Sequence, residues 1–363
     1  MEEWKEYKLG DVCQRLKSGK SIKADQILRQ GKYPVIGGNG LRGYTNEPNF
    51  IGEAAIIGRQ GAYCGNVRYF KGAGYMTEHA IVLVGNKLTN TKYLSCKLSL
   101  MQLGHLSAQS AQPGLSVQLL SKLPIILPSI EKQNIIANII QTLDDKIELN
   151  RRINENLEQQ AQALFKAWFV DFEPFKDGKF VDSELGMIPE GWKVGNFEEF
   201  VEVKYGKDHK KLASGTIPVY GSGGIMRYVD RYLYNKESVL IPRKGSLNNV
   251  MYVNHPFWTV DTMFYTHMKI EGIAKFIYLL ISPKDLLSMN SGSAVPSMTV
   301  DILNKIAIII PPTTILQQFE SIVKPFFIMA ESLQKENQRL AHLRDTLLPK
   351  LMSGELKIND LSI

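Results

Sequence analysis

The sequence predicts an α+β protein in which two mixed α/β domains are separated and connected by two long helices, with an internal pseudo-twofold repeat. The first supporting observation is that residues 33–40 return as residues 217–224, and residues 57–61 as residues 241–245, at an offset of about 184 residues. The second is that apolar residues at helical spacing follow each copy. A globular part followed by a long helix is therefore predicted to occur twice.

The repeat also predicts where the domains begin and end. At 363 residues the chain is long enough for two domains. Pro128 and the pair Pro311-Pro312 mark the change from globular part to helical part in the two copies. We therefore expect a first globular domain over 1–130, a first long helix and linker over 131–191, a second globular domain over 192–312, and a second long helix with the C-terminal segment over 313–363.

Short buried strands are predicted inside each globular part. Apolar runs closed by Gly or Asn turns lie at residues 54–58, 79–84 and 238–241. Residues 91–106 and 274–287 are expected to be helices between strands. Because the strands are short and the loops many, the pattern favours a mixed α/β domain over a doubly wound sheet.

The two helical parts carry apolar residues spaced by threes and fours, from 131 to about 169 and from 317 to about 348. A single helix cannot bury such a stripe alone, so we expect the two to pair as an antiparallel coiled coil. The alternative is that each stripe packs on its own globular domain. Asn150 and Glu336 interrupt the stripes, and polar groups in a seam can fix its register. Pro325 should kink the second helix or mark its start.

Charge is distributed unevenly along the chain, whose formal net charge is +7. Counted from the sequence, residues 1–130 carry +8 and residues 192–312 carry +4, whereas residues 131–191 carry −5 and residues 313–363 carry 0. Two basic globular parts on an acidic or neutral frame are typical of a protein that binds a polyanion. A basic surface that binds nothing is the alternative that charge alone leaves open.

Several functional classes find no support in the sequence. The start of the chain is charged and polar, and no apolar run is long enough to span a bilayer, so we expect a cytoplasmic protein without a membrane partner. Three widely spaced cysteines imply no disulfide framework. The sequence contains no P-loop, no dinucleotide-binding loop, no zinc-ligand spacing and no nucleophile elbow. We therefore expect no catalytic residue, no metal and no cofactor.

The repeated loops carry side chains that suit DNA binding. Arginine can grip guanine with two donors, and glutamine or asparagine can grip adenine similarly. Lysine and backbone amides near glycine can hold phosphates. For any single residue, an ordinary surface turn is an equally good explanation, but the paired recurrence favours function. The predicted DNA-binding residues are Arg42, Tyr44, Arg59, Gln60, Tyr63, Arg227, Tyr228, Arg243, Lys244, Asn248 and Asn249.

A third shared loop, residues 107–114 and 290–297, contains small polar residues that suit either a DNA-backbone contact or a tight turn.

The chain as a whole resembles the specificity subunit of a type I restriction-modification system. The resemblance rests on the order of the four parts and on segments at 9–12, 127–135, 164–175 and 347–356.

The resemblance implies a non-catalytic subunit that binds double-stranded DNA and two methyltransferase subunits, and recruits nuclease and translocase subunits through the complex. Such a complex would be an adenine-DNA methyltransferase and an ATP-dependent endonuclease. Phe165, Trp168, Phe169, Leu347 and Leu348 lie in the matching segments and are the predicted partner-binding residues.

We therefore interpret the chain as a protein that reads DNA with two domains. Each globular domain would read one half of a split, asymmetric target through the major groove, and the helix pair would dock methyltransferase subunits and set the spacing. A helix of about 35 residues is roughly 50 Å long, enough for two sites about one duplex turn apart. The rival hypotheses are a two-headed protein-binding adapter without DNA-reading activity and a self-sufficient nucleic-acid enzyme.

Overall fold

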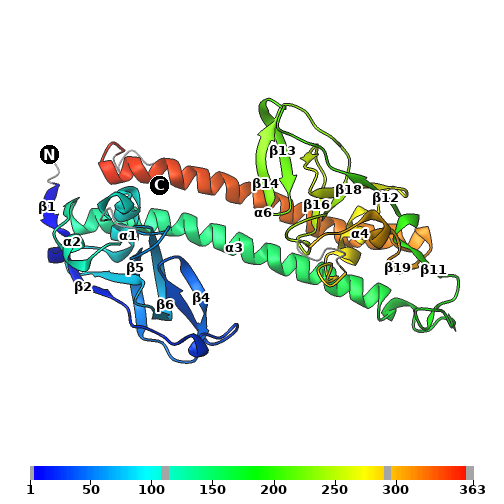
Figure 1. Ribbon diagram of the computed structural model, residues 1–363, viewed down its shortest axis with the longest axis horizontal. Coiled ribbons are helices and arrows are strands. Elements are labelled where there is room, and N and C mark those ends of the chain that lie inside the picture. Colours follow the sequence, from blue (N-terminus) through cyan, green and yellow to red (C-terminus); the bar gives the residue numbers. More distant parts are fainter. Residues whose placement is uncertain (1–3, 108–113, 290–295, 357–363) are drawn as a thin grey trace. The chain divides into compact units, whose positions relative to one another are not determined.

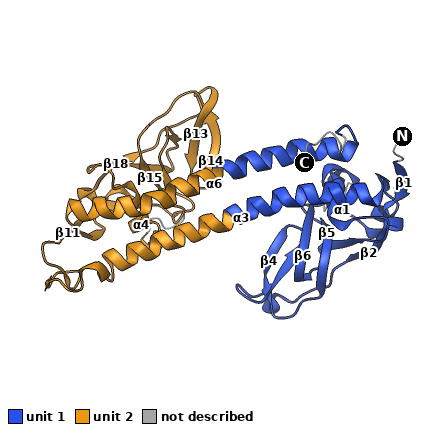
Figure 2. Ribbon diagram, turned by 180° about the vertical axis from the view of Figure 1, so that it is seen from behind, with its two compact units in different colours: residues 1–150, 335–363 blue, residues 151–334 orange. Residues whose placement is uncertain are grey.

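The computed structural model describes residues 4–107, 114–289 and 296–356 and divides the chain into two compact units. Unit 1 comprises residues 1–150 and 335–363, and unit 2 comprises residues 151–334 (Figure 2). Each unit therefore contains one globular part and a segment of each long helix. Most of the third shared loop, at 108–113 and 290–295, lies outside the described residues.

The two long helices are α3 (Ile130–Phe169) and α6 (Thr313–Ser353) (Figure 1). Helix α6 begins directly after the double proline, four residues before its apolar stripe, because the carbonyl of Pro312 accepts the amides of Ile315 and Leu316. Pro325 lies within α6 and does not mark its start. None of the helices in the described ranges is long and apolar enough to cross a membrane.

Helices α3 and α6 run antiparallel, as the sequence predicted. In unit 1, Asn150 of α3 donates to Glu336 of α6 over 2.7 Å. Asp144, six residues earlier on α3, accepts from Arg344 over 2.9 Å, and Arg344 lies eight residues later on α6. The two polar residues expected to interrupt the stripes are therefore bonded to each other. Asn150 is fully buried and also donates to Asn337. This polar pair fixes the helix register in unit 1.

The helices also pack on the globular cores, so both predicted ways of burying the stripes occur. Ile136 and Ile140 of α3 are buried in the core of unit 1, and Phe319 and Val323 of α6 are buried in the core of unit 2. The stripe of each helix is therefore shared between its partner helix and a globular part.

Unit 1 is built on a six-stranded sheet that helix α1 (Thr91–Leu100) covers (Figure 1). In sheet order the strands are β2 (Cys13–Ser18), β7 (Ala80–Gly85), β5 (Phe50–Gly58), β6 (Val67–Met76), β3 (Tyr33–Gly37) and β4 (Gly40–Thr45). Strand β1 (Lys5–Lys8) pairs with β8 (Pro124–Leu127), and the short helix α2 (Val117–Ser121) precedes β8. Asn90 caps α1 by accepting the amide of Tyr93.

Unit 2 repeats this plan with a split sheet. One sheet has the order β12 (Val201–Tyr205), β18 (Met263–Met268), β15 (Ser238–Pro242) and β16 (Met251–Val253), and the other has β14 (Gly224–Val229), β13 (Ser214–Gly221) and β17 (Trp258–Thr259). Strand β11 (Lys193–Asn196) pairs with β19 (Ala307–Ile310), as β1 pairs with β8 in unit 1. The remaining elements are the β9 (Phe180–Val181) and β10 (Ile188–Pro189) pair and helices α4 (Ala274–Ile281) and α5 (Val300–Asn304).

A buried lysine fixes each globular part to a long helix. In unit 2, the ammonium of Lys275 on α4 contacts Glu320 of α6 at 2.6 Å and Glu237 at 3.0 Å, and lies 5.2 Å from the ring centre of Tyr252. A buried charge needs such partners, because an unpaired one would be strongly destabilising.

Unit 1 has the matching arrangement. Lys92 on α1 contacts Asp144 of α3 at 2.6 Å and lies 4.6 Å from the ring centre of Tyr69, whose hydroxyl is hydrogen-bonded to Glu53. Glu53, Tyr69 and Lys92 correspond, at the repeat offset, to the glutamate, tyrosine and lysine of unit 2. The repeat therefore extends to the polar groups that anchor each domain.

Candidate nucleic-acid interface

Each unit carries a hairpin whose turn is formed by the repeated Gly-rich segment. Gly37 faces Gly40 where β3 meets β4, and Gly221 faces Gly224 where β13 meets β14. The φ angle is +98° at Gly40 and +109° at Gly224, a conformation that residues with a side chain rarely adopt. The turn geometry therefore explains why glycine occupies this position in both copies.

The second strand of each hairpin contains a bulge at the same place. The register shift leaves Arg42 without a facing residue in unit 1 and Met226 without one in unit 2. The strand register aligns Arg42 with Met226 and Arg227 with Gly43, so the two hairpin arginines, although only one residue apart in the repeat, are not equivalent. Arg42 is exposed, and Met226 is 59% exposed. The matching bulges therefore present unlike side chains.

The other predicted hairpin residues differ in exposure and in how far they are already hydrogen-bonded within the protein. Arg227 is half-buried and donates from Nη2 to the carbonyl of Leu212 over 2.8 Å, so part of its guanidinium is already occupied. Tyr228 is exposed, whereas Tyr44 is half-buried and its backbone pairs with Leu28. Of these three, Tyr228 is the most open to a ligand.

Matching loops follow β5 and β15 and begin with Arg59 and Arg243. The Arg59 amide donates to the carbonyl of His79 over 2.9 Å, and the Arg243 amide donates to the carbonyl of Thr262 over 2.8 Å. Two residues further on, Gly61 and Gly245 have φ angles of +80° and +84°. The loop backbone is therefore repeated along with the hairpin.

Both loop arginines are tethered to the backbone of an acidic residue. Arg59 donates from Nη1 to the carbonyl of Glu78 over 3.5 Å, and Arg243 from Nη1 to the carbonyl of Asp261 over 3.2 Å. The Arg243 guanidinium also lies 5.4 Å from the ring centre of Tyr205. Because a guanidinium has several donors, one such bond orients it and leaves other N–H groups for a ligand.

The remaining predicted loop residues fall into two groups. Gln60, Tyr63 and Lys244 are exposed, and the Gln60 side-chain oxygen lies 3.2 Å from Nδ1 of His79. Asn248 is engaged at both ends of its amide, since it donates to Asp285 and accepts the amide of Leu287. The structure gives Asn248 a structural role in holding this loop.

Asn249 connects the loop of unit 2 to its hairpin turn, because its side chain donates to the carbonyl of Ser222 over 2.8 Å. In unit 1 the hairpin turn also lies close to the loop that follows β5, because a Cβ added to Gly38 would lie 3.6 Å from the Arg59 amide nitrogen. Hairpin turn and loop therefore form one continuous surface in each unit. We call these surfaces loop face 1, residues 37–42 and 58–63, and loop face 2, residues 221–228 and 242–249.

Sequence reasoning missed two residues at these surfaces. Arg68 on β6 is exposed, and a Cβ at Gly40 would lie 2.9 Å from its Nη1 atom. Met226 was missed because an apolar residue in a turn carries no obvious chemical signal. Only the pairing of β5 with β6, which sets Arg68 opposite Ile56, brings this arginine toward the turn, and the spacing of the sequence does not reveal that pairing.

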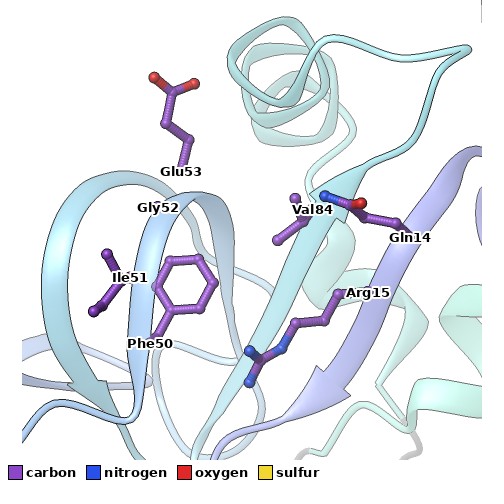
Figure 3. Close-up of a pocket in the computed structure, with 7 residues that line it drawn as sticks. All are labelled: Gln14, Arg15, Phe50, Ile51, Gly52, Glu53 and Val84. Atoms are coloured by element: carbon purple, nitrogen blue, oxygen red, sulfur yellow. The ribbon is translucent and has the colours of Figure 1, made fainter.

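A hollow of about 340 Å³ lies elsewhere in unit 1, lined by Gln14, Arg15, Phe50, Ile51, Gly52, Glu53 and Val84 (Figure 3). Its charged groups have neighbours, although the buried Nε of Arg15 has no hydrogen-bond partner. The Arg15 guanidinium lies 5.2 Å from the ring centre of Phe50, and Glu53 pairs with Lys71 at 3.0 Å. Among the residues that the structure describes, no three His, Cys, Asp or Glu side chains are grouped to hold a metal ion.

The predicted partner-binding residues are largely part of the two cores. Phe165 and Phe169 are 7% and 6% exposed, and their rings lie 5.4 and 4.9 Å from that of Phe276. Trp168 is half-buried in the same aromatic cluster of unit 2. Leu347 and Leu348 are half-buried against the core of unit 1. The structure gives Phe165 and Phe169 a packing role, and their contact with a partner stays a prediction.

Comparison with known proteins gives a consistent result. A family model described as the type I restriction modification DNA specificity domain matches residues 1–159 and 189–342. The chain is 31% identical over 316 residues to the type I restriction enzyme MjaIX specificity subunit of Methanocaldococcus jannaschii, which covers 79% of this chain and 71% of that protein. It is 41% identical over 146 residues to the type I restriction enzyme EcoprrI specificity subunit of Escherichia coli, over 39% of this chain and 36% of that protein.

Among solved structures, the type I restriction-modification S subunit from M. genitalium matches with a TM-score of 0.65 and 20% identity, over 96% of each chain. This likeness supports the fold, including the alternation of globular parts and long helices. The two ranges matched by the family model also contain the two copies of the repeat.

Proposed function

The chain belongs to the type I restriction-modification DNA specificity family, and on this premise we propose that each of its units reads one half of a split, asymmetric DNA target. One observation carries the proposal. The two units share the backbone of the hairpin turn and of the following loop, including positive φ angles at Gly40 and Gly224 and at Gly61 and Gly245. Yet the side chains on this shared backbone differ.

The differing side chains predict unlike half-sites. Loop face 1 presents Arg42 and Gln60 where loop face 2 presents Met226 and Lys244. The exposed Tyr63 of loop face 1 corresponds to Leu247, which is buried. Arginine suits guanine, glutamine suits adenine, and lysine suits phosphate. Two domains with the same frame and different contacts would read two different sequences, so the target would not be a palindrome.

The tethered arginines suit such a role in both units. Arg59 and Arg243 are each oriented by a backbone carbonyl and retain free donors. A donor that is already oriented loses less conformational entropy on binding. Asn248, whose amide is used inside unit 2, is proposed to shape the loop and to contact no base.

The helix pair is proposed to set the spacing between the half-sites. Helix α3 has 40 residues, which corresponds to a length of about 60 Å. One duplex turn is roughly 34 Å, so helices of this length suit two half-sites separated by bases that are not read. The bond between Asn150 and Glu336 would hold the two helices in one register, and hence the spacing constant.

The chain is proposed to act as a non-catalytic subunit. Its relatives are specificity subunits of type I restriction enzymes, which supports DNA, methyltransferase subunits and nuclease subunits as its partners. We propose two methyltransferase subunits, one for each repeat, in a complex that methylates adenine and cleaves DNA at the expense of ATP. The two-headed protein adapter is not favoured by the family match.

The proposal is tested by mapping methylated adenines in the DNA of a host that expresses the full chain with its methyltransferase subunits. The expected result is one motif with two unlike halves and a fixed gap of unread bases. The matched control is the same host with the methyltransferase subunits alone, where the motif should be absent. A motif without a gap, or a motif that persists in the control, would contradict the proposal.

A further inference from the structure

The bulge is the point at which the two hairpins differ most in chemistry. A β-bulge leaves one residue outside the ladder and re-aims its side chain. In unit 1 that residue is Arg42, a cation with several donors, and in unit 2 it is Met226, which has none. The backbone is the same in both, so only the side chain changes.

Each bulge side chain lies over a glycine of the facing strand, where a residue with a side chain would obstruct it. A Cβ at Gly37 would lie 2.7 Å from Cδ of Arg42, and a Cβ at Gly221 would lie 2.5 Å from Sδ of Met226. Both side chains therefore lie across a glycine at the end of the first strand, beside the turn. The repeated glycine is explained by this close approach as well as by the turn.

The bulge side chains are also available to a ligand. Within the described ranges, the Arg42 guanidinium has no hydrogen-bond or ion-pair partner, and Met226 is 59% exposed although it is apolar. Their neighbours Leu41 and Ile225 are 57% and 44% exposed. Exposed residues of this kind at the tip of a hairpin, next to a tethered arginine, are typical of a binding surface.

We propose that the bulge residue of each hairpin contacts a base and makes the two half-sites different. Arg42 would donate to the O6 and N7 acceptors of a guanine, whereas Met226 would pack on an apolar base edge such as the thymine methyl group. This inference rests on the proposed function and names the pair of residues that separates the two specificities.

The test uses the full chain assembled with its methyltransferase subunits and a library of duplexes with randomised sequence. Bound DNA is sequenced for the wild type, Arg42→Met and Met226→Arg. Arg42→Met should lose a guanine preference at one position of one half-site by roughly 5- to 150-fold, with the other half-site unchanged. Met226→Arg should gain a guanine preference in the other half-site alone.

Two further variants separate base contact from loss of charge and from misfolding. Arg152→Met removes an exposed arginine from α3 and should weaken binding evenly over all sequences, if at all. Gly37→Ala keeps Arg42 but displaces its flexible side chain, so it should reproduce the loss of guanine preference in a chain that melts like the wild type.

If Arg42→Met binds the wild-type motif with an evenly reduced affinity, Arg42 contacts phosphate and the inference is overturned while the proposed function stands. The inference is equally overturned if Gly37→Ala keeps the full preference. If the wild type itself selects no split motif, the proposed function fails, and the inference fails with it.

Discussion

Replacing Lys275 with methionine tests how unit 2 is held together. The Lys275 side chain is only 5% exposed, and its ammonium contacts Glu320 and Glu237. Methionine keeps much of the volume but leaves Glu320, 11% exposed, without its cation. Breaking a buried ion pair from one side costs about 3–5 kcal/mol, so the melting temperature of unit 2 should fall by roughly 10 °C.

Lys92→Met is the matched control in unit 1. Its partner Asp144 is 28% exposed and keeps a second cation, since Arg344 contacts it at 2.9 Å. Because the Asp144–Arg344 pair remains, Lys92→Met should lower the free energy of unfolding only by the value of one charged hydrogen bond, about 1.5–3 kcal/mol. Differential scanning calorimetry should therefore show a larger loss for Lys275→Met than for Lys92→Met.

The pH dependence of the Lys275→Met defect gives an independent check. Burial raises the pKa of Glu320 although Lys275 stabilises its charged form, so removing the lysine should raise that pKa further. A carboxyl whose pKa is higher in the folded state contributes stability that is present below its unfolded pKa and is lost as the pH rises through the folded pKa. The stability defect of Lys275→Met should thus shrink as the pH falls through the raised folded-state pKa of Glu320 toward its unfolded pKa. A defect that grows on acidification, or one smaller than that of Lys92→Met, would refute the reasoning.

Three further predictions concern the core, the helix seam and the DNA surface. Phe169→Ala should lower the free energy of unfolding by about 3–5 kcal/mol, because removing a side chain that is only 6% exposed leaves a cavity. Urea titration measures this loss, and a loss below about 1 kcal/mol would argue against the packing role. Asn150→Ala should cost about 1–3 kcal/mol in the same assay, because the hydrogen bonds from the buried Asn150 amide to Glu336 and Asn337 are lost, and an unchanged midpoint would show that the seam does not need these bonds. Arg68→Ala should weaken DNA binding evenly over sequences and reduce the slope of affinity against salt by about one; fluorescence anisotropy over a salt series measures this, and an altered base preference would contradict a phosphate contact.

The fold was predictable because the repeat and the helical stripes are properties of sequence spacing. Asn150 and Glu336 each broke an apolar stripe, and the structure shows them bonded across the seam. The apolar spacing of α6 begins later than the helix itself, and the double proline, whose second carbonyl accepts the first helical amides, indicates the start more closely. The shared lysine anchors were missed because residues distant in sequence, such as Tyr69 of β6 and Lys92 of α1, meet only where the helix packs on the sheet.

The candidate site was predictable in place but not in detail. The glycines and arginines of the loops were found from the repeat, since turns with positive φ demand glycine. The bulge was not, because a one-residue shift in strand register leaves no mark on the sequence. It falls at equivalent positions, Arg42 and Met226, which the repeat offset of 184 residues also aligns. Likewise, the internal hydrogen bonds that engage Asn248 depend on Asp285, a residue distant along the chain.

The most direct test of the central claim, that each unit reads its own half of a split target, is a domain exchange read out by methylome sequencing. Residues 1–130 of the full chain are replaced by the matching domain of a relative with a different target, and the methylated motif is compared with that of the wild type. The account predicts that one half-site changes while the other half-site and the gap stay the same. A motif in which both halves change, or neither does, would contradict it.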